Sequence, residues 1–252
     1  MVAARHHPPR MRVAVISDIH GNLHALEAVL EDDDRERPDA VWCLGDLVGY
    51  GPRPNECCSA VRERAELCLA GNHDLGVLGE LDLEEFAPDA ASSALWTRGV
   101  LTEEARSYLA GLESSAVRPA FELFHASPRD PVWEYVLSGE AALAALELTS
   151  APLVLVGHSH VPLAIVLDGR RLAGGHAPGE SEADLAKGRW LLNPGSVGQP
   201  RDGDPRAAYL LVDLDAKRAF FRRVEYPVGR TQVEIRERGL PEALAARLAS
   251  GV

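Results

Sequence analysis

Aspartate and histidine side chains recur in this sequence at the ends of short apolar runs. The first pair is Asp18 and His20, which follow the apolar run 13–16. A carboxylate and an imidazole at the carboxyl end of a buried strand can both face the crevice in which α/β sheets bind ligands, and both are common metal ligands. The pair therefore indicates a metal site whose remaining ligands come from later segments.

Further residues with ligand chemistry follow later apolar runs. They are Asp46, Asn72, His73, His125, His158 and His160. None is a thiolate, so the set suits Mn²⁺, Fe, Ni²⁺ or Zn²⁺ rather than an iron–sulfur cluster or a structural zinc site. It is also too large for one ion. Two cations about 3.5–4 Å apart would use it, with one carboxylate bridging them, and Asp46 is the candidate bridge.

Sequence spacing alone does not divide these ligands between two cations. Our division gives Asp18, His20 and His160 to one cation and Asn72, His125 and His158 to the other, with Asp46 shared. Two dications outweigh the charges of two carboxylates and one hydroxide, so the centre stays positive within an acidic protein. Such a centre favours a phosphate-bearing substrate.

The apolar pattern predicts the strands and helices that must position these residues. Strands are expected at 13–16, 40–46, 66–70, 121–124, 152–156, 161–169, 189–192, 207–215 and 218–226. Helices are expected after the capping residues Asn22 and Asn55, within 75–112, at 139–150 and in a C-terminal segment, 227–252. Residues 170–188 are expected to form a mobile loop. We expect one domain over residues 1–252, with a flexible tail at 1–11.

Composition limits the partners and the compartment. The formal charge is −12 and the isoelectric point is near 5.2, which argues against binding long nucleic acid or an anionic membrane. No segment approaches the roughly 18 apolar residues of a membrane span. The four cysteines lack zinc-site spacing, and two of them, Cys57 and Cys58, are adjacent, which is poor geometry for a disulfide. This pattern favours a reducing compartment. We expect a cytoplasmic protein, leave homo-oligomerisation open, and note Met11 as an alternative start.

Five ordered motifs resemble those of the calcineurin-like metallophosphoesterases. They are Asp18-Ile19-His20, Gly45-Asp46, Gly71-Asn72-His73-Asp74, Phe124-His125 and Gly157-His158-Ser159-His160, and residues 193–204 are similar to the small bacterial and archaeal phosphodiesterase branch. The resemblance implies an α/β (α+β) fold, a four-layered αββα sandwich of two mixed β-sheets flanked by helices. It also implies the metal shell given above, with His73 donating a proton to the leaving oxygen and Asp74 orienting His73.

The activity implied by this resemblance is hydrolysis of phosphodiester bonds in small, nucleotide-type substrates, through in-line attack of a metal-bridging hydroxide. We expect both metal ions to be Mn²⁺, with Fe, Ni²⁺, Zn²⁺ or Mg²⁺ as alternatives. Tyr50, Asn55 and Arg201 lie in Gly- and Pro-rich loops and are candidates for substrate contacts. The alternatives are a hydrolase of dinucleoside polyphosphates such as diadenosine tetraphosphate, and a scaffold that binds metal and partner proteins without catalysis.

Overall fold

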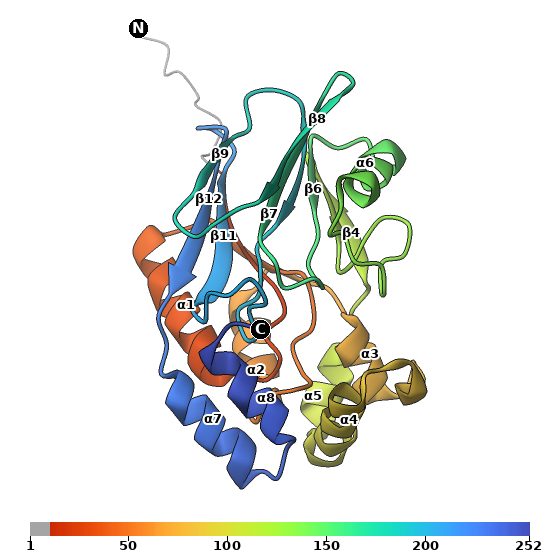
Figure 1. The fold of residues 1–252 in the computed structure, drawn as a ribbon, viewed down its shortest axis with the longest axis vertical. Helices are drawn as coiled ribbons and strands as arrows, with labels where there is room; N and C mark the ends of the chain where they lie inside the picture. Colours follow the sequence, from red (N-terminus) through yellow and green to blue (C-terminus); the bar gives the residue numbers. More distant parts are fainter. Residues whose placement is uncertain (1–10) are drawn as a thin grey trace, which may run out of the picture.

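Two six-stranded sheets pack face to face, with helices on their outer faces and at one end (Figure 1). This architecture is taken from a computed structural model that describes residues 11–252. The tail expected at residues 1–11 therefore lies almost wholly outside the described residues, and the structure does not test whether Met1 or Met11 is the start. The four-layered αββα sandwich predicted from the sequence is confirmed. Within residues 11–252, no helix is long and apolar enough to cross a bilayer.

The first sheet contains the first and the last strand of the described fold, β1 and β12. Its strand order is β3-β2-β1-β11-β12-β9. The strands are β1 (Arg12–Ile16), β2 (Ala40–Cys43), β3 (Leu67–Cys68), β9 (Glu182–Asp184), β11 (Ala207–Asp213) and β12 (Arg218–Val224). Strand β1 pairs with β2 in parallel and with β11 in the antiparallel direction, so the sheet is mixed. The carboxyl ends of β1, β2 and β3 therefore meet at one edge.

The second sheet has the order β4-β5-β6-β10-β7-β8. Its strands are β4 (Ser115–Arg118), β5 (Phe121–Phe124), β6 (Leu153–Leu155), β7 (Leu163–Asp168), β8 (Arg171–His176) and β10 (Arg189–Asn193). Strands β5, β6 and β10 run parallel to one another. The loops that follow β5 and β6 contain His125, His158 and His160, which brings these histidines to the edge where β1 and β2 end.

Helices complete the outer layers. Helices α1 (Leu23–Glu36) and α2 (Pro54–Arg64) cover the first sheet, and α6 (Gly139–Leu148) covers the second (Figure 1). The remaining helical elements gather at the end of the sandwich. They are α3 (Asn72–Leu78), α4 (Pro88–Val100), α5 (Glu103–Leu109), α7 (Val228–Glu237), α8 (Glu242–Ala246), and the short 3₁₀ turns Leu83–Glu85 and Arg247–Ala249. The predicted cap Asn22 accepts a backbone N–H at the start of α1, and Thr102 does the same at the start of α5.

Successive side chains of β1 point to opposite faces of the sheet, so this one strand contributes to two hydrophobic cores. Val13 and Val15 face the second sheet and pack in the central layer, which includes Trp42 and Phe121. Ala14 and Ile16 face the opposite way, toward α1 and α2. Because successive side chains of a strand point to opposite faces, a fully apolar run is required where both faces are covered. The first strand is therefore buried on both sides and holds Asp18 rigidly at its end.

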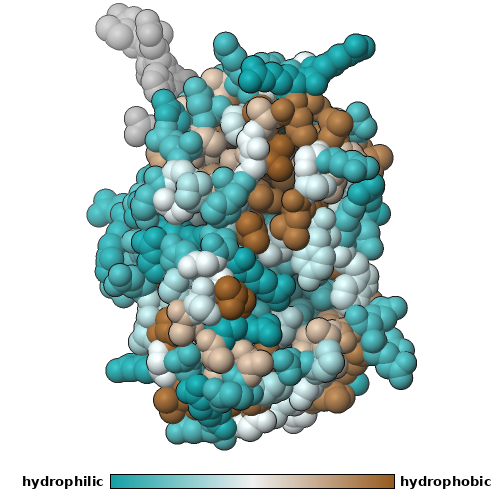
Figure 2. Space-filling view, viewed as in Figure 1, coloured by the Kyte–Doolittle hydropathy of each residue, from teal (hydrophilic) through white to brown (hydrophobic). Residues whose placement is uncertain are grey.

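Residues 170–188 differ from the sequence prediction of a mobile loop. They form β8, which pairs with β7 from Leu163–His176 to Asp168–Arg171, and β9, which pairs with β12. The segment is rich in glycine, and it becomes a strand because β7 offers an unpaired edge. Figure 2 shows apolar side chains gathered where β7, β8 and α6 meet. A groove in this part of the protein is lined by Leu137 and Leu172, among others. None of the residues lining this groove belongs to the metal centre.

Candidate metal centre

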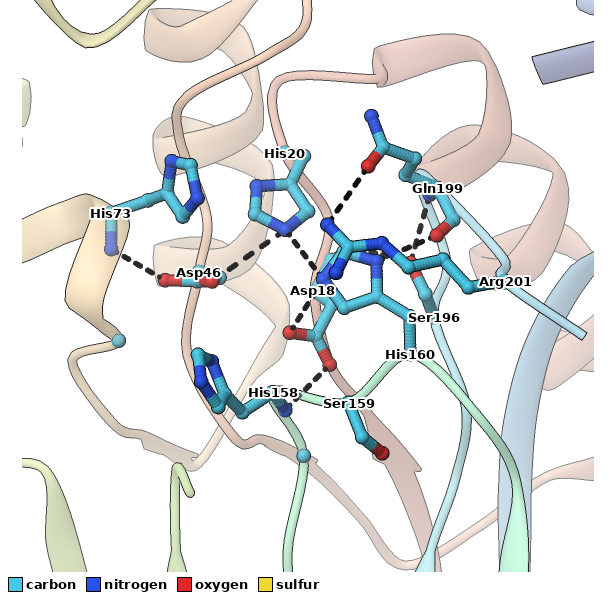
Figure 3. Close-up of polar contacts among 12 residues, drawn as sticks. Asp18, His20, Asp46, His73, His158, Ser159, His160, Ser196, Gln199 and Arg201 are labelled. Carbon is cyan, nitrogen blue, oxygen red and sulfur yellow. Dashed lines mark hydrogen bonds and ion pairs between the residues drawn. The ribbon is translucent and has the colours of Figure 1, made fainter. Parts of the chain in front are cut away.

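The predicted ligands lie in tight loops directly after the strands. Asp18, His20, Asp46, His158 and His160 all have positive φ, between 50° and 61°. Non-glycine residues seldom adopt this left-handed conformation, which costs of the order of 1 kcal/mol or more at each position. Strain of this kind collects at functional sites, where the surrounding structure enforces it. Figure 3 shows these side chains converging from separate loops.

The side chains form two clusters of metal-ligating atoms that share Asp46. The first consists of Asp18, His20, Asp46 and His160, and the second consists of Asp46, His125 and His158. Asp46 Oδ2 lies 3.5 Å from His20 Nε2 and 3.6 Å from His125 Nε2. The structure thus brings together the groups that our division assigned to two cations, with the aspartate we expected between them.

Asn72 joins the second cluster through its side-chain oxygen. Asn72 Oδ1 lies 3.3 Å from His125 Nε2, and Asn72 is buried at the start of α3. A carbonyl oxygen is a suitable ligand for a hard or borderline cation. All seven predicted ligand residues are therefore collected at one end of the sandwich.

Two carboxylate oxygens of this centre lack hydrogen-bond donors, which bears on whether the centre fits cations. Asp18 Oδ1 and Asp46 Oδ2 are buried and have no hydrogen-bond donor within the described chain. A buried acceptor without a partner is unfavourable, and a buried carboxylate more so. The neighbouring imidazoles offer nitrogen atoms rather than compensating charge. Cations between these groups would satisfy both oxygens, so the residues fit a metal centre.

Backbone carbonyls orient three of the imidazoles. The Nδ1 atoms of His20, His125 and His160 lie 3.1, 2.8 and 2.6 Å from carbonyl oxygens. The carbonyls belong to Val48, Leu44 and Gln199, respectively. Each contact requires the N–H to be on Nδ1, which leaves the Nε2 lone pair directed at the clusters.

His158 uses its other nitrogen in the same way. Its Nε2 lies 3.1 Å from the carbonyl oxygen of Trp133, so Nε2–H donates and Nδ1 is left as the ligand atom. The ring of Tyr135 stacks on His158, with centroids 4.1 Å apart. The loop that contains Trp133 and Tyr135 is thereby tied to a predicted ligand.

Burial sets the protonation of these groups. It lowers the pKa of His158 to about 2 and holds the pKa values of His20 and His160 well below the ordinary range. It raises the pKa of Asp18 to about 7 and that of Asp46 well above its usual value. The imidazoles of His20, His158 and His160 are therefore neutral, as metal ligation requires, and a cation would favour the ionised carboxylates.

His73 lies beside the clusters, and its ring is not one of the ligating groups. Its backbone N–H donates to Asp46 Oδ1 at 2.9 Å, and its ring contacts Tyr50 with centroids 4.3 Å apart. Gly49 leaves room for the ring, because a Cβ at this position would lie 2.4 Å from His73 Nδ1. The ring is buried, and its Nδ1 has no hydrogen-bond partner.

The Asp74 carboxylate is bonded to backbone amides. It accepts backbone N–H groups from Leu47, Val48 and Gly71, at 2.9, 3.1 and 2.9 Å. The resemblance implied that Asp74 orients His73, and no hydrogen bond joins its carboxylate to Nδ1 of the His73 ring. Asp74 therefore braces the loops after β2 and β3, which contain Asp46 and Asn72.

The three candidate substrate residues are placed differently. Tyr50 and Arg201 line a cavity of about 210 Å³ above the clusters, and Arg201 donates to Tyr50 Oη at 3.3 Å. Asn55 lies elsewhere, with its side chain bonded to Val100 O and Thr102 N at 2.9 and 2.8 Å. It is not the cap of α2 either, since that helix follows Arg53. The structure thus corrects the predicted cap and places Asn55 outside the cavity that Tyr50 and Arg201 line.

Six residues that line the same cavity were not predicted from the sequence. They are Glu85, Phe86, Ala87, Ala90, Trp133 and Tyr135. They belong to no motif, and the only signal in the sequence is the concentration of aromatic residues in Trp133-Glu134-Tyr135. Their meeting depends on the fold, because Phe86 precedes α4 and Trp133 follows β5.

Comparison with known proteins agrees with this geometry. The calcineurin-like phosphoesterase superfamily domain matches residues 11–217. A crystal structure of a metallophosphoesterase from Sphaerobacter thermophilus aligns with TM-score 0.88 and 45% identity, covering 96% of this chain and 100% of that one. An uncharacterized protein of Methanocaldococcus jannaschii is 38% identical over 95% of this chain and 98% of its own length. Phosphodiesterase YfcE of Escherichia coli K12 is 26% identical over 81% of this chain and 89% of its own.

Proposed function

Because the chain belongs to the calcineurin-like phosphoesterase superfamily, a family of metal-dependent hydrolases, we propose that it cleaves phosphodiester bonds of small, nucleotide-type substrates with a pair of divalent cations. The observation that supports this proposal most directly is the position of Asp46 in both ligand clusters. A single carboxylate shared between two sets of imidazoles is the arrangement that a two-metal phosphoesterase needs.

The residues divide naturally between two cations. Asp18, His20 and His160 would hold one, Asn72, His125 and His158 the other, and Asp46 both. When bound, the cations would supply a hydroxide nucleophile at neutral pH and neutralise the phosphoryl oxygens. The oxygen and imidazole ligands favour Mn²⁺, with Fe, Ni²⁺, Zn²⁺ or Mg²⁺ as alternatives. The chain itself contributes fixed imidazole tautomers and a rigid set of loops.

We propose that His73 assists the leaving oxygen. Burial lowers its pKa to about 3, so its imidazole is neutral while the cavity is free of substrate. A phosphodiester anion beside the ring would favour the imidazolium form and raise this pKa. His73 would then transfer a proton to the departing alkoxide, which typically contributes about 10²–10⁴-fold. The His73 ring packs against the Tyr50 ring, and Gly49 leaves the space that the His73 ring occupies.

Arg201 provides the cationic group for the substrate. The guanidinium is largely buried at the cavity, and its hydrogen bonds go to the neutral oxygens of Tyr50 and Gln199. No carboxylate within residues 11–252 approaches it within 4.0 Å. A buried guanidinium without an ion-pair partner is available to bind a phosphoryl oxygen.

Metal-dependent turnover of bis-p-nitrophenyl phosphate tests this function. The chelated protein should be inactive and should regain activity with Mn²⁺ or one of the other four metals. Asp46→Asn should lower activity more than about 100-fold. Asp33→Asn is a matched control, because Asp33 is also a buried aspartate but lies on α1 outside the site. Activity that survives chelation or Asp46→Asn would refute the proposal, and the absence of turnover with all five metals would favour the scaffold.

A further inference from the structure

The cavity has an apolar wall next to His73. The ring of Phe86 packs edge-on against His73, with centroids 5.4 Å apart, and against Trp133 at 4.9 Å. Trp133 is itself fixed, because its carbonyl oxygen accepts the Nε2–H of His158. The wall is therefore held between the two ends of the site, His73 and a predicted metal ligand.

The cationic group of the cavity lies next to Tyr50. Arg201 donates to Tyr50 Oη, the Tyr50 ring contacts His73, and the His73 ring contacts Phe86. Tyr135, in the loop that contains Trp133, also lies near Arg201. Phosphoryl oxygens bound to Arg201 would therefore lie toward Tyr50, while the ring of Phe86 lies directly against His73. His73 marks the position of the oxygen that leaves, so the group attached to that oxygen extends toward Phe86 and Trp133.

We propose that this aromatic wall binds the leaving alcohol and that this alcohol is a nucleoside, an inference that rests on the proposed function. A nucleobase is planar and stacks on aromatic side chains, with a contribution typical of tenfold or more in binding per base. In the reaction, water adds to phosphorus and the bond from phosphorus to the nucleoside oxygen breaks. That oxygen keeps the bonding electrons and takes a proton, giving a nucleoside and a phosphomonoester.

Charge on this side of the cavity argues against a leaving group that contains further phosphates. Glu85 lies beside Phe86 at the rim, and Arg201 is the one guanidinium or ammonium group among the described lining residues. A dinucleoside polyphosphate would place additional anionic groups near the Glu85 carboxylate without a cation to bind them. The site therefore favours a single phosphodiester over diadenosine tetraphosphate.

The orientation of cleavage tests this inference with one substrate. Methyl adenosine-5′-phosphate can be split in two ways, and the Mn²⁺-loaded full-length protein should release adenosine and methyl phosphate in preference to AMP and methanol. Trp133→Ala should shift the product ratio about tenfold toward AMP. Trp133→Phe should retain most of the preference, because it keeps an aromatic face. Leu137→Ala is the control, since Leu137 is 57% exposed, close in sequence and outside the cavity.

Glu85 provides an independent second test. Glu85→Gln should raise kcat/KM for diadenosine tetraphosphate relative to the methyl diester about threefold. AMP and methanol as the main products, or a product ratio that Trp133→Ala leaves unchanged, would overturn the inference. These failures are distinct from failure of the proposed function, because the latter would also abolish metal-dependent turnover of bis-p-nitrophenyl phosphate.

Discussion

The Nε2 atoms of His20 and His160 face each other across 3.0 Å. Both rings donate their Nδ1–H to backbone carbonyls, so the two facing nitrogens present lone pairs rather than a donor and an acceptor. Such a pair is unfavourable unless a cation lies next to both atoms. The fold therefore holds two ligands in an arrangement that the metal-free protein does not favour.

Replacing one of these histidines should weaken metal binding without lowering the stability of the metal-free protein. His160→Gln removes the facing lone pairs, so we expect the chelated variant to match or exceed the chelated wild type in thermal stability. Metal should stabilise the wild type by about 3 kcal/mol at 100 times the dissociation constant, and the variant by less. Thermal unfolding with chelator and with Mn²⁺ measures both effects. A chelated variant that is much less stable than the chelated wild type would contradict this account.

Acid should destabilise the protein through its buried neutral histidines. The pKa of His73 is lowered to about 3 by burial, whereas the unfolded chain takes up this proton near pH 6.5. Stability from this group is therefore complete above pH 6.5 and declines as the pH falls toward 3. The decline is about 1.4 kcal/mol per pH unit, or about 2 kcal/mol between pH 6.5 and 5.

The contribution of His73 can be isolated with His73→Gln in the presence of chelator. Unfolding by urea at pH 7 and pH 5 should show that the variant loses about 2 kcal/mol less than the wild type. The comparison cancels the opposite effect of Asp18, whose raised pKa lowers stability as the pH rises toward about 7. Equal losses in the two proteins would mean that His73 is not buried in its neutral form.

Gly49→Ala should impair catalysis by displacing His73. A Cβ would lie 2.4 Å from His73 Nδ1, and Gly49 has a φ of +82°. We expect about a 100-fold loss on methyl phosphodiesters, with a much smaller loss on p-nitrophenyl esters, whose leaving group needs no proton. Gly169→Ala is the matched control, since its φ is also positive but its Cβ would meet nothing within 4 Å. Metal content by mass spectrometry should be unchanged in both, and equal losses on the two esters would count against the role of His73.

Asn55→Ala should affect stability without affecting the reaction. The side chain of Asn55 joins α2 to the start of α5 through Val100 and Thr102, so its loss should cost about 1 kcal/mol in the free energy of unfolding. KM and kcat for bis-p-nitrophenyl phosphate should stay within about twofold of the wild type. A large increase in KM would restore Asn55 as a substrate contact.

The metal ligands were predictable because their signal is local. An apolar run such as 13–16 predicts a strand, and Asp18 and His20 follow it directly, so the edge where they meet could be inferred before the fold was known. The actual role of Asp74 could not be inferred in this way. Its three backbone donors belong to Leu47, Val48 and Gly71. They come together only in the folded protein, because the loops after β2 and β3 are far apart in the sequence.

Two other features depend on tertiary partners. The segment Arg171–His176 contains two glycines and has weak strand propensity, and it becomes β8 because β7 supplies an open edge. Phe86 and Trp133 have no common sequence pattern, and they meet because the loop after β5 is tied to His158. Features that depend on contacts between distant parts of the chain could not be predicted from the sequence.

Electron paramagnetic resonance of the Mn²⁺-loaded protein shows whether Asp46 is shared by two ions, since a carboxylate shared by two Mn²⁺ ions couples their spins. We predict two Mn²⁺ per chain with an exchange-coupled spectrum, and loss of the coupling in Asp46→Asn but not in Asp33→Asn. One isolated Mn²⁺ per chain, or two uncoupled ions that Asp46→Asn leaves unchanged, would contradict the account.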